Sequence, residues 1–248
     1  MTSEDKLLAL AKEVHNSKAL IYVQRIETLQ TNFFVFQRNY EELMKLIKVS
    51  RNPKKMFELW ALRNRHKLEV VISEILRLLH NFLASAETLV SHTRIIMNDW
   101  YDQTEFLHEY KTQIKNRFIK DPRTGFIKDL RNFNLHYSFP VTHATFSLKA
   151  DEKTGETIEN FSFVLIKSSL LQWKNWNERA KTYLISCNEE IDIGDLVNEY
   201  YKEILDFHNW IVARIYEIHK EDFVWYEEMR QKTLNAMSDE EKKARGII

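Results

Sequence analysis

Apolar residues recur every three to four positions along most of the chain, which is the spacing of an amphipathic α-helix. Thr2 or Ser3 can cap a first helix, whose apolar positions continue to a break at Asn16–Ser17. A second helix is predicted over 19–49. It ends in a turn at 50–53, because the residue before a proline avoids the helical region.

A third helical run covers 54–119, where the chain has neither glycine nor proline. Because this run is too long for one ordinary helix, we expect a bend or break near 99–103. Residues 121–125 (DPRTG) predict a turn. A short helix is then expected over roughly 126–137, and Pro140 marks its end.

The period changes after this helix. Residues 141–167 are rich in Thr, Val, Phe and Ile in near-alternation, with Gly155 between the two halves, and they predict one inserted β-hairpin. The helical pattern returns over 168–236 with a restart at 193–195, and 237–248 is expected to be a frayed tail. The predicted fold is therefore mainly α, a single long-helix bundle interrupted by one hairpin.

The composition agrees with a packed helical bundle. The 248 residues include only four glycines and three prolines, and 44% of the chain is hydrophobic. The acidic and basic residues balance to zero net charge, so only their distribution is informative. Cys187 is the one cysteine, which excludes an internal disulfide and favours a cytoplasmic location. The N-terminal residues do not show a signal-peptide pattern, and no apolar run is long enough to predict a transmembrane helix.

Several common chemistries lack their residue patterns. The sequence contains no CxxC pair, no HExxH and no acidic cluster at ligand spacing, so no metal site is expected. Its four glycines are not spaced as a phosphate-binding loop or a dinucleotide fingerprint, so no cofactor is expected either.

The stretch LRNFNLHYSFP, residues 130–140, holds the most informative polar group. Histidine can transfer protons near neutral pH, and arginine grips phosphate oxygens with two parallel donors. Asn132 and His136 are four residues apart and share one helix face. Arg131 lies about 140° around the helix from His136, so it would reach around or meet the histidine of a second subunit.

Arg131-Asn132-Phe133-Asn134-Leu135-His136 resembles the signature of the HEPN superfamily (higher eukaryotes and prokaryotes nucleotide-binding). That signature is an arginine, four to six residues and a histidine, often with asparagine directly after the arginine. A second Arg–His pair, Arg214 and His219, lacks the asparagine.

The resemblance implies a helical bundle that forms a homodimer around one shared cleft. It also implies a metal-independent endoribonuclease that acts on RNA in a toxin–antitoxin, phage-defence or stress system, with an antitoxin or regulatory protein as a possible partner. Arg131 would stabilise the phosphorane, His136 would transfer a proton, and Asn132 would position His136 or the phosphate. The products would carry 2′,3′-cyclic phosphate and 5′-OH ends.

Two further sets of residues are candidates for supporting the Arg131–His136 motif. A basic excess leads into the motif and predicts phosphate binding by Lys115, Arg117, Arg123 and Lys128. A polar stripe on an otherwise apolar helix could orient the motif, bridge two helices through buried water, or face solvent; its members are Asn81, Ser85, Thr88 and His92. Arg94 and His80 lie off this stripe and are weaker candidates.

An alternative reading remains open for the whole chain. Arg131 could pair with a surface acid, and His136 could cap the C-terminus of its helix, where a cation is favoured. The protein would then be a non-catalytic helical interaction or nucleic-acid-binding protein, and the basic surface would be ordinary solvated charge.

Overall fold

The computed structural model describes residues 3–50, 52–150, 157–244 and 246 of the chain. The fold is mainly α with one small antiparallel sheet, as the sequence predicted. In chain order the helical elements are α1 (Ser3–His15), α2 (Lys18–Ser50), α3 (Pro53–Trp60), η1 (Leu62–Asn64), α4 (Arg65–Trp100), α5 (Glu105–Ile114), η2 (Lys115–Ile119), α6 (Pro122–His136), α7 (Lys167–Leu170), α8 (Glu178–Ser186), α9 (Ile193–Ile218), α10 (Lys220–Ala236) and α11 (Asp239–Ala244).

The chain forms two compact units, one of residues 1–31 and 208–248 and one of residues 32–207. In the first unit α1 packs against α10. The ring of Tyr22 stacks on the ring of His219 with 3.6 Å between centroids. The motif lies in the second unit, where every site considered below is found.

Helix α11 occupies part of the segment that the sequence predicted to be a frayed tail. The N–H of Glu241 donates to the Ser238 hydroxyl at 3.2 Å, and the N–H of Ser238 donates to the Glu241 carboxylate at 2.7 Å. This reciprocal pair is a capping box, which satisfies two donors at the start of a helix. The frayed-tail prediction was therefore wrong for 239–244.

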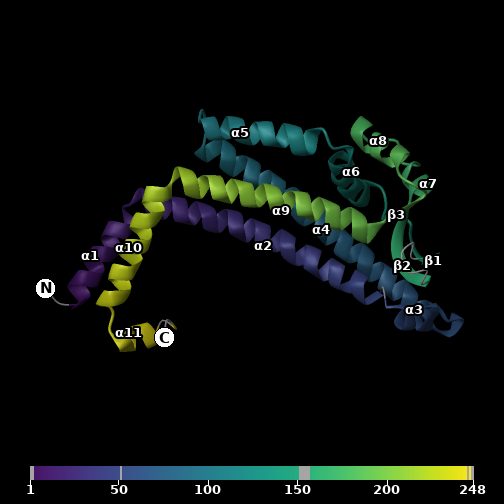
Figure 1. Ribbon diagram of the computed structural model, residues 1–248, viewed down its shortest axis with the longest axis horizontal. Coiled ribbons are helices and arrows are strands. Elements are labelled where there is room, and N and C mark those ends of the chain that lie inside the picture. The colour runs from purple at the N-terminus through teal and green to yellow at the C-terminus, as the bar shows by residue number, and fades with distance from the viewer. Residues whose placement is uncertain (1–2, 51, 151–156, 245, 247–248) are drawn as a thin grey trace. The chain divides into compact units, whose positions relative to one another are not determined.

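The second unit is built on long helices that lie side by side. Figure 1 shows α4 running along the parts of α2 and α9 that belong to this unit. Aromatic rings join them: Phe36 of α2 lies 5.1 Å from Phe82 of α4, and Tyr40 of α2 stacks on Tyr201 of α9 at 3.7 Å. These ring contacts join α2, α4 and α9 in the core of the second unit.

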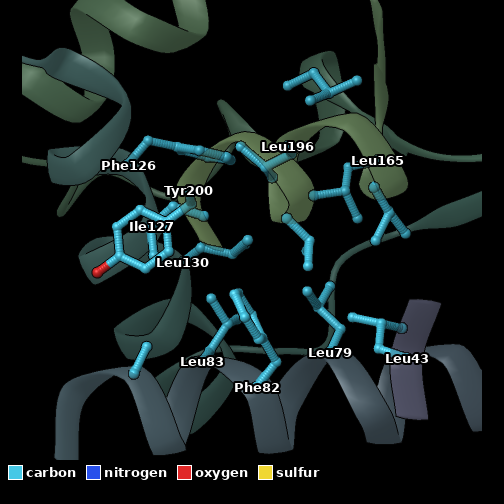
Figure 2. Close-up of a cluster of buried hydrophobic side chains, with 14 of the residues drawn as sticks. Leu43, Leu79, Phe82, Leu83, Phe126, Ile127, Leu130, Leu165, Leu196 and Tyr200 are labelled. Atoms are coloured by element: carbon cyan, nitrogen blue, oxygen red, sulfur yellow. The ribbon is translucent and has the colours of Figure 1, made fainter. Parts of the chain in front are cut away.

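The core continues from α4 into the motif helix α6. Figure 2 shows Leu79, Phe82 and Leu83 of α4 pointing toward Ile127 and Leu130 of α6. Each of these five side chains is buried to 3% exposure or less. One face of α6 is therefore fixed against α4 by apolar burial, which leaves the remaining faces of α6 for polar side chains.

The predicted hairpin is present as strands β1 (Thr142–Ala150) and β2 (Thr157–Ile166), paired antiparallel with Phe146 opposite Phe161. Gly155 and its loop lie outside the described residues. A third strand, β3 (Glu190–Asp192), pairs with the end of β2 and gives the order β1-β2-β3. The sequence did not predict β3, since three residues carry no readable alternation.

Two predicted helix breaks are confirmed. The break at Asn16–Ser17 separates α1 from α2, and the break near 99–103 separates α4 from α5. At the second break Gln103 adopts the left-handed conformation, with φ 58°. Thr104 then caps α5 by accepting a hydrogen bond from the N–H of Leu107 at 3.3 Å.

Other boundaries differ from the prediction. A break between α3 and α4 at 61–64 was missed because the segment contains no glycine or proline. The predicted turn at 121–125 is the first part of α6, and the last long helix divides into α9 and α10 at His219. In the described ranges no helix has the length and apolarity needed to cross a membrane.

Candidate functional site

Helix α6 carries the motif and has a defined start and end. The Asp121 carboxylate accepts a hydrogen bond from the N–H of Arg123 at 3.0 Å, and Pro122 occupies the first helical position, where no donor is needed. At the other end the N–H of Tyr137 donates to the carbonyl of Phe133 at 2.9 Å. Asp-Pro here is a helix start, which corrects the predicted turn and moves the start of the motif helix four residues earlier.

Close packing against α8 holds α6 from a second side. A Cβ on Gly125 would lie only 2.8 Å from the Cβ of Arg179, so the two helices approach at a position where only glycine fits. Buried Asp129 accepts a hydrogen bond at 2.7 Å from the N–H of Asn177, which precedes α8. These contacts fix the direction in which the motif side chains leave the helix.

Arg131 is half-buried and lines a small pocket of about 70 Å³, together with Leu83 and Glu87 of α4 and Tyr200 of α9. Its Nη1 donates to the Asn132 side-chain oxygen at 3.3 Å. Burial raises the pKa of Tyr200, so that neighbour stays neutral. Within the described residues no ion pair joins Arg131 to Glu87 or to any other acid.

His136 is the last residue of α6 and is exposed to solvent. The helical spacing places it about 140° around the axis from Arg131. Within one chain the structure therefore does not bring the two motif side chains together. A shared reaction centre would need the histidine or the arginine of another copy.

The four predicted phosphate-binding residues fall into two groups. Arg117 and Arg123 form ion pairs with α9, Arg117 with Glu203 at 3.0 Å and Arg123 with Glu199. Arg123 is also 3.2 Å from Asp121, and although burial opposes its charge, these acids raise the pKa of Arg123. In contrast, Lys115 and Lys128 are exposed, and Lys128 lines the pocket of Arg131.

The predicted polar stripe on α4 faces away from α6. The pocket side of α4 carries Leu83, Ala86, Glu87 and Val90, and the stripe lies roughly half a turn around the helix from them.

The described hydrogen bonds of the stripe residues are made with α2 or within α4, and none is made with the motif helix. His92 lies 3.0 Å from the side-chain oxygen of Asn32 on α2, while Ser85 and Thr88 donate to carbonyls of their own helix. The stripe residues, Asn81 included, do not line the pocket of Arg131. His92 therefore contacts α2 directly, from an exposed position on α4.

Asn134 was not selected as a candidate from the sequence, and His80 was named only as a weaker candidate off the polar stripe. Among the described residues, five buried side-chain atoms have no hydrogen-bond partner, and four of them are His80 Nδ1, Arg131 Nε, Asn134 Nδ2 and Asn134 Oδ1. A buried unsatisfied polar group costs about 1–3 kcal/mol, so each of these atoms calls for a partner. The spacing of three residues between Arg131 and Asn134 was the available signal in the sequence.

Other reactive groups do not gather into a second centre. In the part of the chain that the structure describes, no three His, Cys, Asp or Glu side chains are grouped to hold a metal ion. The thiol of Cys187 is half-buried, and burial raises its pKa despite a hydrogen bond with Tyr183. It is therefore not an activated nucleophile.

Comparisons with protein-family models, with curated proteins and with solved structures found no match for this chain. Any functional conclusion therefore depends on the motif and its geometry.

Proposed function

We propose that this chain is a HEPN-like, metal-independent endoribonuclease. The Arg131-Asn132-x3-His136 pattern supports the class. The observation that carries the proposal is the state of Arg131, a half-buried guanidinium that forms no described ion pair, although Glu87 lines the same pocket. A cation held in this way is suited to meet a phosphate group.

The reaction is a transesterification within the RNA chain. The 2′-oxygen attacks the adjacent phosphorus, the P–O5′ bond breaks, and the ends are a 2′,3′-cyclic phosphate and a 5′-OH. His136 transfers a proton, either from the attacking 2′-OH or to the leaving O5′. Arg131 stabilises the extra negative charge on the phosphorane, and Asn132, which accepts a hydrogen bond from Arg131, orients the guanidinium.

A second copy of the chain completes the site in this proposal. Arg131 and His136 lie on different sides of α6, so two motif helices facing each other would supply the missing partner. The residues around His136 fit such an interface, since four exposed apolar side chains, each 44–54% exposed, follow one another along this stretch: Leu135, Tyr137, Phe139 and Val141. A regulatory protein or antitoxin could cover the same surface and keep the enzyme silent.

The test is incubation of the purified protein with total RNA in EDTA, beside a His136→Ala variant. Fragments with cyclic-phosphate ends should form with the parent and not with the variant. His108→Ala is the matched control, because His108 is also an exposed helical histidine and lies outside the motif. Cleavage that persists in His136→Ala would contradict the proposal.

A non-catalytic interaction protein is the second candidate. The observation in its favour is the same row of exposed apolar side chains, which would serve a protein interface whether or not His136 is catalytic. Under this function a folded parent would leave RNA intact at all protein concentrations, and substitution of Tyr137 or Phe139 would abolish partner binding.

A further inference from the structure

The register of α4 against α6 places His80 and Asn134 toward the same end of the interface, next along it from Arg131. Glu87 lines the pocket of Arg131, whereas the ring of His80, two turns earlier on α4, lies 6.0 Å from the ring of Phe139, beyond the end of α6. The numbering of α4 therefore falls as that of α6 rises, and the helices are antiparallel. Asn134 follows Arg131 by about one turn toward Phe139, which places it on the side of His80.

The unsatisfied atoms of these residues are chemically complementary. The Nε of Arg131 and the Nδ2 of Asn134 can only donate, the Oδ1 of Asn134 can only accept, and His80 Nδ1 can do either according to its tautomer. The four atoms therefore include donors and acceptors that can pair with one another, directly or through shared water.

We propose that His80, Arg131 and Asn134 act as one polar unit, in which His80 and Asn134 are positioning residues for the Arg131 guanidinium. The inference rests on the proposed function, since the oriented guanidinium is the group that would meet the scissile phosphate. An imidazole and an amide fix the inner edge of the guanidinium and leave its positive charge intact. An acidic partner would hold it equally well but would neutralise it.

Asn134→Asp tests this point, because it keeps the shape of the side chain and adds the acid that the unit lacks. The variant should fold with an unchanged or higher Tm, while kcat for RNA cleavage falls about tenfold or more and KM changes less than about threefold. Asn98→Asp is the matched control, since Asn98 is exposed on α4 and takes the same change of charge. Equal kcat in Asn134→Asp and Asn98→Asp would overturn the proposal.

The role of His80 is tested by two substitutions that differ in which ring nitrogen they imitate. Asparagine places its amide near the position of Nδ1, the unsatisfied atom, and glutamine places it near Nε2. His80→Asn should retain kcat within about threefold, whereas His80→Gln and His80→Leu should both lose about tenfold. Full activity in His80→Leu would show that His80 does not position Arg131.

A double-mutant cycle on unfolding tests the unit without relying on RNA cleavage. The effects of His80→Leu and Asn134→Leu on stability should be non-additive. The unfolding equilibrium constant of the double variant should be about fivefold smaller than the value that the two single increases predict when multiplied. Additive losses would overturn the polar unit. Coupled losses in a protein that leaves RNA intact would instead uphold the unit and contradict the proposed ribonuclease.

Discussion

Arg123 and Arg131 lie about two turns apart on α6, yet the charges around the two guanidinium groups differ. Arg123 is enclosed by the carboxylates of Asp121 and Glu199, and it ties the start of α6 to α9. Arg131 donates to the Asn132 side-chain oxygen and shares its pocket with Glu87, but no described ion pair joins it to an acid. The first half of α6 is thus held by paired charges, whereas Arg131 in the second half keeps a charge that no described ion pair neutralises.

The largest expected effect on RNA cleavage comes from His136, the last residue of α6. His136→Ala should reduce RNA cleavage about 100-fold or more, because a positioned acid or base contributes at least that factor. Its Tm should match that of the parent, since the side chain is exposed. Single-turnover cleavage measures the effect, and a Tm drop in parallel with lost activity would point to a structural role.

Gly125→Ala probes the first half of the helix. Its Cβ would lie 2.8 Å from the Cβ of Arg179 and 3.3 Å from the backbone nitrogen of Ala180. Overpacking costs about 1–3 kcal/mol and outweighs the helix propensity that alanine gains over glycine. Denaturant unfolding should show a loss of about 1–2 kcal/mol. Lys128→Ala, an exposed site on the same helix, should be neutral, and equal stability of the two variants would contradict the close-packing account.

Asn132→Ala should have a smaller effect, on activity alone. The variant removes the acceptor that Arg131 contacts at 3.3 Å, so the guanidinium becomes less well oriented. We expect kcat to fall about tenfold with little change in Tm. Asn132→Asp should be worse than Asn132→Ala, because it neutralises the arginine as well. The reverse order would count against the need for an uncompensated charge.

The smallest effect is expected on the opposite face of α4. Thr88 is exposed and bonds a carbonyl of its own helix, so Thr88→Ala should change stability by less than about 0.5 kcal/mol and leave cleavage unchanged. A loss of cleavage in this variant would restore the stripe as support for the motif.

The sequence predicted the helical architecture and several boundaries because these depend on local signals. The breaks at Asn16–Ser17 and near 99–103 and the inserted hairpin follow from turn residues and from a change of period. Asp121-Pro122 was misread since the same dipeptide serves as a turn and as a capped helix start. β3 was missed because its identity as a strand comes from pairing with β2.

The candidate site also contains some residues that local sequence signals identify and others that only the packing of the helices identifies. Arg131, Asn132 and His136 could be selected from spacing alone, and their catalytic roles stay predictions. His80 could not be assigned to the motif, because its proximity to the end of α6 depends on how α4 packs against α6. The ion pairs of Arg117 and Arg123 likewise depend on α9, which is far away in sequence.

The most direct test is a crossed comparison of Arg123→Ala and Arg131→Ala, each measured for Tm and for RNA cleavage in EDTA. We expect Arg123→Ala to lower Tm while its cleavage rate below Tm stays near that of the parent, and Arg131→Ala to abolish cleavage at an unchanged or higher Tm. Equal losses of stability and of cleavage in the two variants would show that the two halves of α6 do not differ in role.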